Sequence, residues 1–148
     1  MANSVVSLVD KERIEKRIAE IEEFLEAAEK VASLDPGEFL SDFRNWYSLR
    51  MAIVSIVESA TSISLELLGR ECINAGSYSA VFILMAKRGL LPVDVGEGMA
   101  RLASLRNLII HRYWEVDDLR IRKEALEGGF DLIKRFVNAV RGAIEGGH

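Results

Sequence analysis

Four polar residues that could carry chemistry lie close together in the segment RNLIIHRY, residues 106–113. They are Arg106, Asn107, His111 and Tyr113, and His111 is one of only two histidines in the chain of 148 residues. A guanidinium binds phosphate oxygens through a planar fork and stabilises charge that develops during transfer. An imidazole takes or gives a proton near neutral pH. These residue types therefore suit chemistry at a phosphate.

RNA is a suitable substrate for such groups because it carries its own nucleophile, the 2′-hydroxyl, and no metal ion is then required. The amide of Asn107 could orient the imidazole or bind a ribose hydroxyl. Two simpler interpretations stay open. His111 could stabilise the C-terminus of a helix through the helix dipole. Tyr113 could pack against Trp114 and close the end of that helix.

The spacing of the cluster indicates how a helix would present it. Asn107 and His111 are four residues apart and share a face. Arg106 and His111 differ by about 140° around the helix axis. One ideal helix therefore does not direct both side chains at one atom, whereas a second copy across a two-fold axis could complete the arrangement. This spacing predicts a homodimer.

The rest of the chain predicts an all-α fold, a bundle of four to five helices within a single domain, residues 1–148. Hydrophobic residues make up 49% of the chain, there are two prolines, and no long alternating segment indicates a strand. Apolar residues spaced four and three apart from Ile14 to Ala32 predict a first helix over residues 7–33. The glutamates on its opposite face are expected to be solvated and not to bind a metal.

A second helix is expected from the capping sequence at Asp35 to the residue before Gly69. Its apolar residues cover more than one stripe, which predicts a central position or self-association. Three further helices are expected over residues 78–88, 94–113 and 117–141, the first capped by Ser77 and ended by Gly89, the last interrupted at Gly128-Gly129. The residues expected to be buried in the last two are Leu102, Leu105, Ile109, Leu119, Leu126, Leu132, Ile133, Phe136 and Val140.

Composition restricts the function further. The net charge of −4 argues against a protein that coats nucleic acid, although residues 87–123 carry eight basic and five acidic residues. That segment could also be a mixed solvated surface. The single cysteine, Cys72, excludes an internal disulfide and a cysteine-based metal site. We see no export signal and no apolar run near the ~20 residues of a membrane span, so we expect a cytoplasmic protein with no membrane contact.

The cluster Arg106-Asn107-x3-His111-x-Tyr113 resembles the R-x4-H-x-Y signature of HEPN-domain proteins, specifically the HepT-like toxins of prokaryotic toxin–antitoxin pairs. The likeness extends along most of the chain. The sequence IVESA around Glu58 looks like the acidic position of the family's second helix. The segments SYSAVFILMAKRGLL and DLIKRFV resemble two further family patterns, whereas Gly128-Gly129 is less typical.

This resemblance implies a specific function. Family members form homodimers in which the motif helices of two chains make a composite cleft. They cleave RNA, often tRNA, as endoribonucleases that need neither a metal nor a cofactor. Carried over, Arg106 would bind and polarise the scissile phosphate, His111 would be the acid–base residue, and Asn107 would position one of them or the ribose. Tyr113 would be the residue that a nucleotidyltransferase antitoxin modifies with AMP, which silences the toxin.

Two alternatives stay open at this point. One is a non-catalytic HEPN subunit that binds RNA or nucleotide together with a nucleotidyltransferase. The other is a structural dimerisation bundle without a site. The identity of the RNA and of the cleaved bond are not encoded in any pattern of the sequence.

Overall fold

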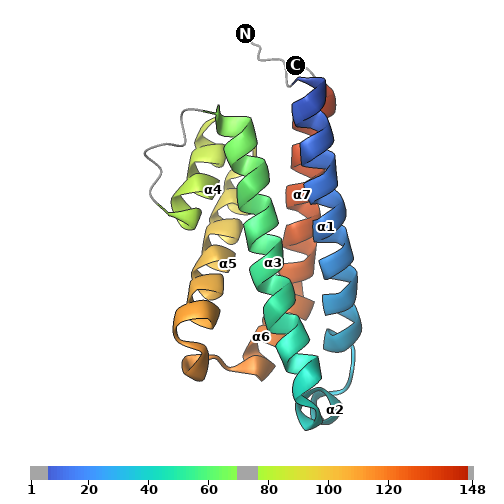
Figure 1. Ribbon diagram of the computed structural model, residues 1–148. Helices are drawn as coiled ribbons and strands as arrows, with labels where there is room; N and C mark the ends of the chain where they lie inside the picture. The colour runs from blue at the N-terminus through green and yellow to red at the C-terminus, as the bar shows by residue number, and fades with distance from the viewer. Residues whose placement is uncertain (1–6, 70–76, 147–148) are drawn as a thin grey trace.

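The computed structural model describes residues 7–69 and 77–146, and the regular elements within them are all helical (Figure 1). The all-α prediction is confirmed for this part of the chain. Cys72 lies outside the described residues. The elements are α1 (Leu8–Ala32), α2 (Pro36–Ser41), α3 (Phe43–Leu68), α4 (Tyr78–Lys87), α5 (Val93–His111), the 3-10 turn η2 (Tyr113–Glu115), α6 (Asp118–Glu124), the π-helical turn η3 (Ala125–Gly129) and α7 (Phe130–Gly146).

The long helix α3 lies at the centre of the bundle (Figure 1). The pair α1 and α7 packs on one side of it, and the pair α4 and α5 packs on the other, while α6 crosses from α5 to α7. Apolar side chains from every long helix meet between these pairs and are fully buried, among them Ile18, Ile21, Val57, Ile63, Met99 and Phe136. Removal of this apolar surface from water is the main force that holds the bundle together.

The predicted first helix is confirmed, with Ser7 as its N-cap and the expected apolar stripe buried. Its glutamates, however, are not all free in solvent. Glu22 accepts hydrogen bonds from Arg141, and Glu29 accepts one from Lys134 at 3.0 Å, so this face of α1 is paired with α7.

The helix α3 has the length and the apolar composition of a membrane span, so the expectation that no segment reaches that length was wrong. Burial accounts for this composition, because 61% of its most apolar 18-residue window is enclosed by the other helices. A core helix that is covered on several sides is apolar nearly all round.

The expected second helix is two helices. Asp42 adopts an extended conformation (φ −130°, ψ 116°) and its side chain accepts a hydrogen bond from the backbone N–H of Arg44, which caps α3. The single helix drawn from the sequence overlooked this cap, because Phe39, Phe43 and Trp46 keep a helical spacing of four and three across Asp42. Asp35 caps α2 as predicted, through the backbone N–H groups of Gly37 and Glu38.

The fourth helix is shorter than predicted and buries a different stripe. It ends at His111, and Tyr113 belongs to the separate turn η2. Ile109 is buried as expected, but Leu102 and Leu105 are only partly buried. The fully buried residues are Val95, Met99 and Ala103.

The fifth helix is interrupted at Gly128-Gly129, where the sequence predicted an interruption. Gly128 has φ +156°, in a region that L side chains rarely adopt, and the chain forms a π-helical turn between α6 and α7. Ile133, Phe136 and Val140 are buried as expected, and Leu132 is partly buried. Leu119 and Leu126 are exposed, so their predicted burial was wrong.

A close helix crossing brings α4 against α5. A Cβ atom built on Gly96 would lie 2.7 Å from Cβ of Ala86 and 3.0 Å from the carbonyl oxygen of Phe82. Neither neighbour is the flexible end of a long side chain, so only glycine permits this approach. Because Gly96 fixes how α4 packs against α5, the first residue of α4, Tyr78, lies beside the C-terminal half of α5.

We predict that Gly96→Ala destabilises the fold by about 1–3 kcal/mol, because overpacking must push α4 away from α5. The matched control is Gly142→Ala in α7, where nothing lies within 4 Å of the added Cβ. That control should be neutral or stabilising by up to about 1 kcal/mol, since alanine is the better helix former. Urea unfolding followed by circular dichroism measures both. Equal stabilities of the two variants would contradict the close crossing.

Candidate functional site

The guanidinium of Arg106 lies where α3, α4 and α5 meet. Its Nη2 donates to Oε2 of Glu58 on α3 at 2.9 Å, and its Nη1 donates to Oδ1 of Asn107 at 3.0 Å. Its Cζ atom lies 4.7 Å from the centre of the Tyr78 ring on α4. The side chain is only 16% exposed, so these contacts fix the plane of the guanidinium.

This arrangement leaves part of the fork available to a ligand. A guanidinium has five N–H donors, and the described contacts of Arg106 use one on each Nη atom. Its Nε is buried and has no hydrogen-bond partner among the described residues. One hydrogen on each Nη atom therefore remains for the oxygens of a phosphate. Glu58 is itself half exposed, so its ion pair with Arg106 is screened by water and can exchange for another anion.

The structure joins Arg106 to Asn107 by a hydrogen bond, but no described contact joins His111 to Arg106. His111 is the last residue of α5, and its side chain is exposed with no hydrogen bond to any described residue. It therefore follows the helical geometry expected from the sequence, in which Arg106 and His111 are about 140° apart around the axis. Within one chain, the guanidinium of Arg106 and the imidazole of His111 therefore do not form one closed site.

Tyr113 lies in the turn directly after α5 and is 61% exposed. Its ring makes an edge-to-face contact with Trp114, with 5.2 Å between centroids, and Trp114 is 67% exposed. The contact between Tyr113 and Trp114 that the simpler interpretation expected is therefore present. The pair does not enter the core, however, so the hydroxyl remains accessible from outside.

Arg50 on α3 is a residue that the sequence analysis missed. Its Nε and Nη2 each donate to the Asp118 carboxylate at 2.8 Å, and its Nη1 donates to the backbone carbonyl of Tyr113 at 3.3 Å. The hydrogen bonds with Asp118 raise the pKa of Arg50. An arginine within an apolar helix was the available signal, but its partner is 68 residues away in sequence.

The family model described as ribonuclease HepT-like matches residues 14–140. The chain belongs to this family. No curated protein matches the sequence. The fold of this HepT-like chain is shared with several solved structures.

One such structure is a toxin–antitoxin assembly with AMP-PNP (TM-score 0.79, 19% identity, 88% of this chain and 98% of that chain). A second is a tri-AMPylated HEPN toxin of Shewanella oneidensis in complex with an MNT antitoxin (TM-score 0.76, 20% identity, 88% and 97% covered). A third is the toxin–antitoxin complex MntA–HpeT (TM-score 0.76, 19% identity, 88% and 98% covered). At these identities the likeness shows that the HepT-like chain has the HEPN toxin fold.

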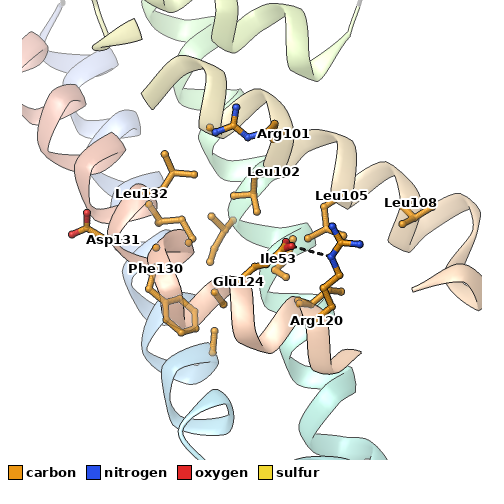
Figure 2. A pocket seen from close by; sticks show the side chains of 18 of the residues that line it. Ile53, Arg101, Leu102, Leu105, Leu108, Arg120, Glu124, Phe130, Asp131 and Leu132 are labelled. Carbon is orange, nitrogen blue, oxygen red and sulfur yellow. Dashed lines mark hydrogen bonds and ion pairs between the residues drawn. The ribbon is translucent and has the colours of Figure 1, made fainter. Parts of the chain in front are cut away.

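Two hollows flank the cluster of Arg106 in this HepT-like fold. A polar hollow of about 600 Å³ is lined by Glu58 and Tyr78 together with Ser55, Ser62 and Arg17, so it borders two residues that contact Arg106. The other, of about 860 Å³, lies between α5, α6 and α7, where Leu102, Leu105 and Leu132 form apolar walls (Figure 2).

The larger hollow is not lined by Arg106 or by its partners Glu58 and Tyr78. Leu102 and Leu105 project from the side of α5 opposite to Asn107 and His111. Charged residues at its rim form two pairs with one another, Arg120–Glu124 at 3.0 Å (Figure 2) and Arg135–Asp94 at 2.8 Å. The hollow lies against the π-helical turn between α6 and α7, and Gly128 and Gly129 are part of its lining.

Proposed function

We propose that this HepT-like chain is an endoribonuclease toxin that cleaves RNA without a metal and is silenced by a nucleotidyltransferase antitoxin. The observation that carries the proposal is the Arg106 guanidinium, which is oriented by three helices and keeps free donors on both Nη atoms, on the same helix as an exposed histidine. Membership of the ribonuclease HepT-like family supports the reaction class. Transfer RNA is the first substrate to test.

The chemistry that we propose needs only these side chains and the RNA. His111 takes the proton of a ribose 2′-hydroxyl, and the 2′-oxygen attacks the adjacent phosphorus. The bond from phosphorus to the 5′-oxygen of the next nucleotide breaks, and that oxygen takes up a proton from water as it leaves. Arg106 stabilises the charge on the phosphate oxygens, and Asn107 positions Arg106 or the ribose. The products are a cyclic phosphate and a 5′-hydroxyl end.

We propose further that two chains form the complete site as a homodimer. Phe43, Tyr47 and Met51 on α3 are each at least 48% exposed. They lie on the same face of the helix as Glu58, within about 80° around its axis. A two-fold contact over this face would bury apolar surface and place a second α5 beside Arg106, so that His111 of one protomer could serve Arg106 of the other.

The remaining assignments follow from this function. We propose that residues 1–148 form a single domain, that the protein acts in the cytoplasm where its RNA substrate is found, and that it requires no membrane, cofactor or metal ion.

One observation favours a second candidate function. Arg106 is already paired with Glu58, and a guanidinium that keeps this partner would hold RNA or nucleotide without stabilising the transition state. The chain would then be a non-catalytic HEPN subunit that acts with a nucleotidyltransferase. Cleavage assays separate the two candidates, because both bind RNA but only the first cuts it.

We predict that His111→Ala and Arg106→Ala each lower RNA cleavage by about 10²–10⁴-fold, since each removes an acid–base or charge-stabilising group. The matched control is Arg101→Ala, an exposed arginine on the same helix with no described partner, which should retain activity. Gel-based cleavage of purified tRNA measures the rates, and circular dichroism verifies the fold. EDTA should not change the wild-type rate.

Two outcomes would contradict this account. Full activity of the His111→Ala variant would assign the cleavage to a contaminating nuclease. Loss of wild-type activity on chelation would require a metal site in place of the proposed mechanism.

We predict that Tyr113 accepts AMP. The phenolic oxygen attacks the α-phosphorus of ATP, the bond from that phosphorus to the bridging oxygen breaks, pyrophosphate leaves, and the phenolic proton passes to a base of the nucleotidyltransferase. The added phosphate would then be near His111 and could pair with Arg106 or Arg112, in competition with RNA. This would silence cleavage.

Co-expression with a nucleotidyltransferase antitoxin, followed by intact-mass spectrometry, tests the prediction. Wild type should gain one or more AMP units, and Tyr113→Phe should gain none. Tyr47→Phe is the matched control, because Tyr47 is also exposed, at 54%, but lies on α3 and is not part of the motif. AMP that persists on the Tyr113→Phe variant would remove Tyr113 from the account.

A further inference from the structure

The turn that carries Tyr113 has little apolar packing of its own. Every residue from Arg112 to Glu115 is exposed, two backbone hydrogen bonds define the turn, and an exposed side-chain bridge of 3.4 Å joins Arg112 to Glu115. The N–H of Glu115 donates to the carbonyl of Arg112 at 2.8 Å, and that of Val116 donates to the carbonyl of Tyr113 at a long 3.4 Å. An exposed turn held by so few contacts needs another restraint to keep one conformation.

The side chain of Arg50 supplies such a restraint from the neighbouring helix α3. It donates at 3.3 Å to the same Tyr113 carbonyl that Val116 reaches only weakly. Its other two nitrogens, Nε and Nη2, donate hydrogen bonds to the two carboxylate oxygens of Asp118, the first residue of α6. Arg50 therefore ties the turn and the start of the following helix to α3 with three hydrogen bonds.

The environment of Arg50 makes this link rigid. Its side chain is 12% exposed and that of Asp118 is 15% exposed, and the guanidinium lies 5.0 Å from the centre of the Trp46 ring. A fork held on both oxygens of a carboxylate has a fixed plane. By contrast, Arg44 pairs with Asp42 on the same helix while 77% exposed, and it makes no described contact with the turn.

Stability alone is a poor explanation for such a pair. A buried ion pair often contributes less to stability than apolar residues of the same size would, because both charges must lose their hydration. Apolar residues could not donate a hydrogen bond to the Tyr113 carbonyl, nor could they fix the direction of such a donor. The geometry thus favours a role in presenting Tyr113.

We propose that Arg50 is a positioning residue for AMP transfer to Tyr113. This inference rests on the proposed function, in which Tyr113 is the acceptor. The phenolic oxygen must approach the α-phosphorus in line with the departing pyrophosphate. Arg50 holds the backbone of Tyr113 in one position, so that the ring projects outward from a fixed point. Less conformational entropy is then lost when the phenolic oxygen is oriented for the transfer. The partner enzyme then meets a preformed acceptor.

The test compares three variants as substrates of a nucleotidyltransferase antitoxin, with ATP. The double variant Arg50→Met/Asp118→Asn removes the clamp without leaving an unpaired buried charge. Arg50→Lys keeps the charge but replaces the fork by a single point donor. Arg44→Met is the matched control on the same helix. For each, kcat and KM of AMP transfer are measured, together with hydrogen exchange of the Val116 amide.

A misplaced acceptor should act on the chemical step and not on docking of the partner. The double variant should lose about 100-fold in kcat, the loss typical of a 1 Å misplacement, with KM for the chain nearly unchanged. Its Val116 amide should exchange faster, because the turn opens more often. Arg50→Lys should fall between the double variant and wild type, and Arg44→Met should match wild type in both measurements.

The outcomes separate this inference from the function on which it rests. Wild-type kcat in the double variant would overturn the role of Arg50 while leaving Tyr113 as the acceptor. A wild-type chain that gains no AMP would overturn the proposed regulation and this inference together. A rise in KM with unchanged kcat would show that Arg50 forms part of the docking surface, and would also overturn the positioning role.

Discussion

A guanidinium that is largely removed from water must be compensated by partners, and Arg106 finds its partners on three different helices. Burial of a charge without hydrogen bonds or a counter-ion is costly. Glu58 on α3, Asn107 on α5 and the ring of Tyr78 on α4 provide this compensation for the two Nη atoms and the face of the guanidinium, while the buried Nε has no partner among the described residues. The three helices must therefore keep their mutual register for Arg106 to remain where it is.

Several features of the fold follow from this requirement. Gly96 allows α4 to approach α5 closely enough for Tyr78 to reach the guanidinium. The central position of α3 brings Glu58 to the same point. The apolar core supplies the stability, and it sets the position of the three backbones that hold the arginine.

Arg106 differs in its surroundings from His111 and Tyr113, the other residues of the proposed chemistry. Arg106 is enclosed and oriented before any substrate arrives, as a group that stabilises developing charge should be. His111 and Tyr113 are exposed beyond it, where a second protein or an RNA strand can reach them. The division suits a protein whose activity is both carried out and silenced at one end of α5.

The sequence predicted the features that depend on local patterns. The apolar stripe from Ile14 to Ala32, the Ser77 cap and the interruption at Gly128 are encoded within a few residues each, and all three are present. The motif residues of the candidate site were singled out by their residue types and by the family resemblance, and the roles given to them are proposals. The start of α3 was missed because the apolar residues on both sides of Asp42 keep one helical spacing, so periodicity does not reveal the break.

What the sequence could not predict depends on contacts between distant segments. Arg50 and Asp118 are 68 residues apart, and the stacking of Tyr78 on Arg106 requires the docking of α4. The exposure of Leu119 and Leu126 depends on the path of the π-helical turn, which leaves this part of α6 and η3 uncovered. Periodicity gives the face of a helix, but not what another helix places against it.

The claim that two chains share one site is tested most directly by mixing inactive variants. Arg106→Ala and His111→Ala chains are unfolded together and refolded, so that mixed dimers form, and tRNA cleavage is then measured. If Arg106 of one chain works with His111 of the other, half of the dimers carry one intact site of two, and about a quarter of the wild-type activity returns. Mixed dimers that form and remain inactive, or a chain that is monomeric at micromolar concentration by light scattering, would contradict the shared site.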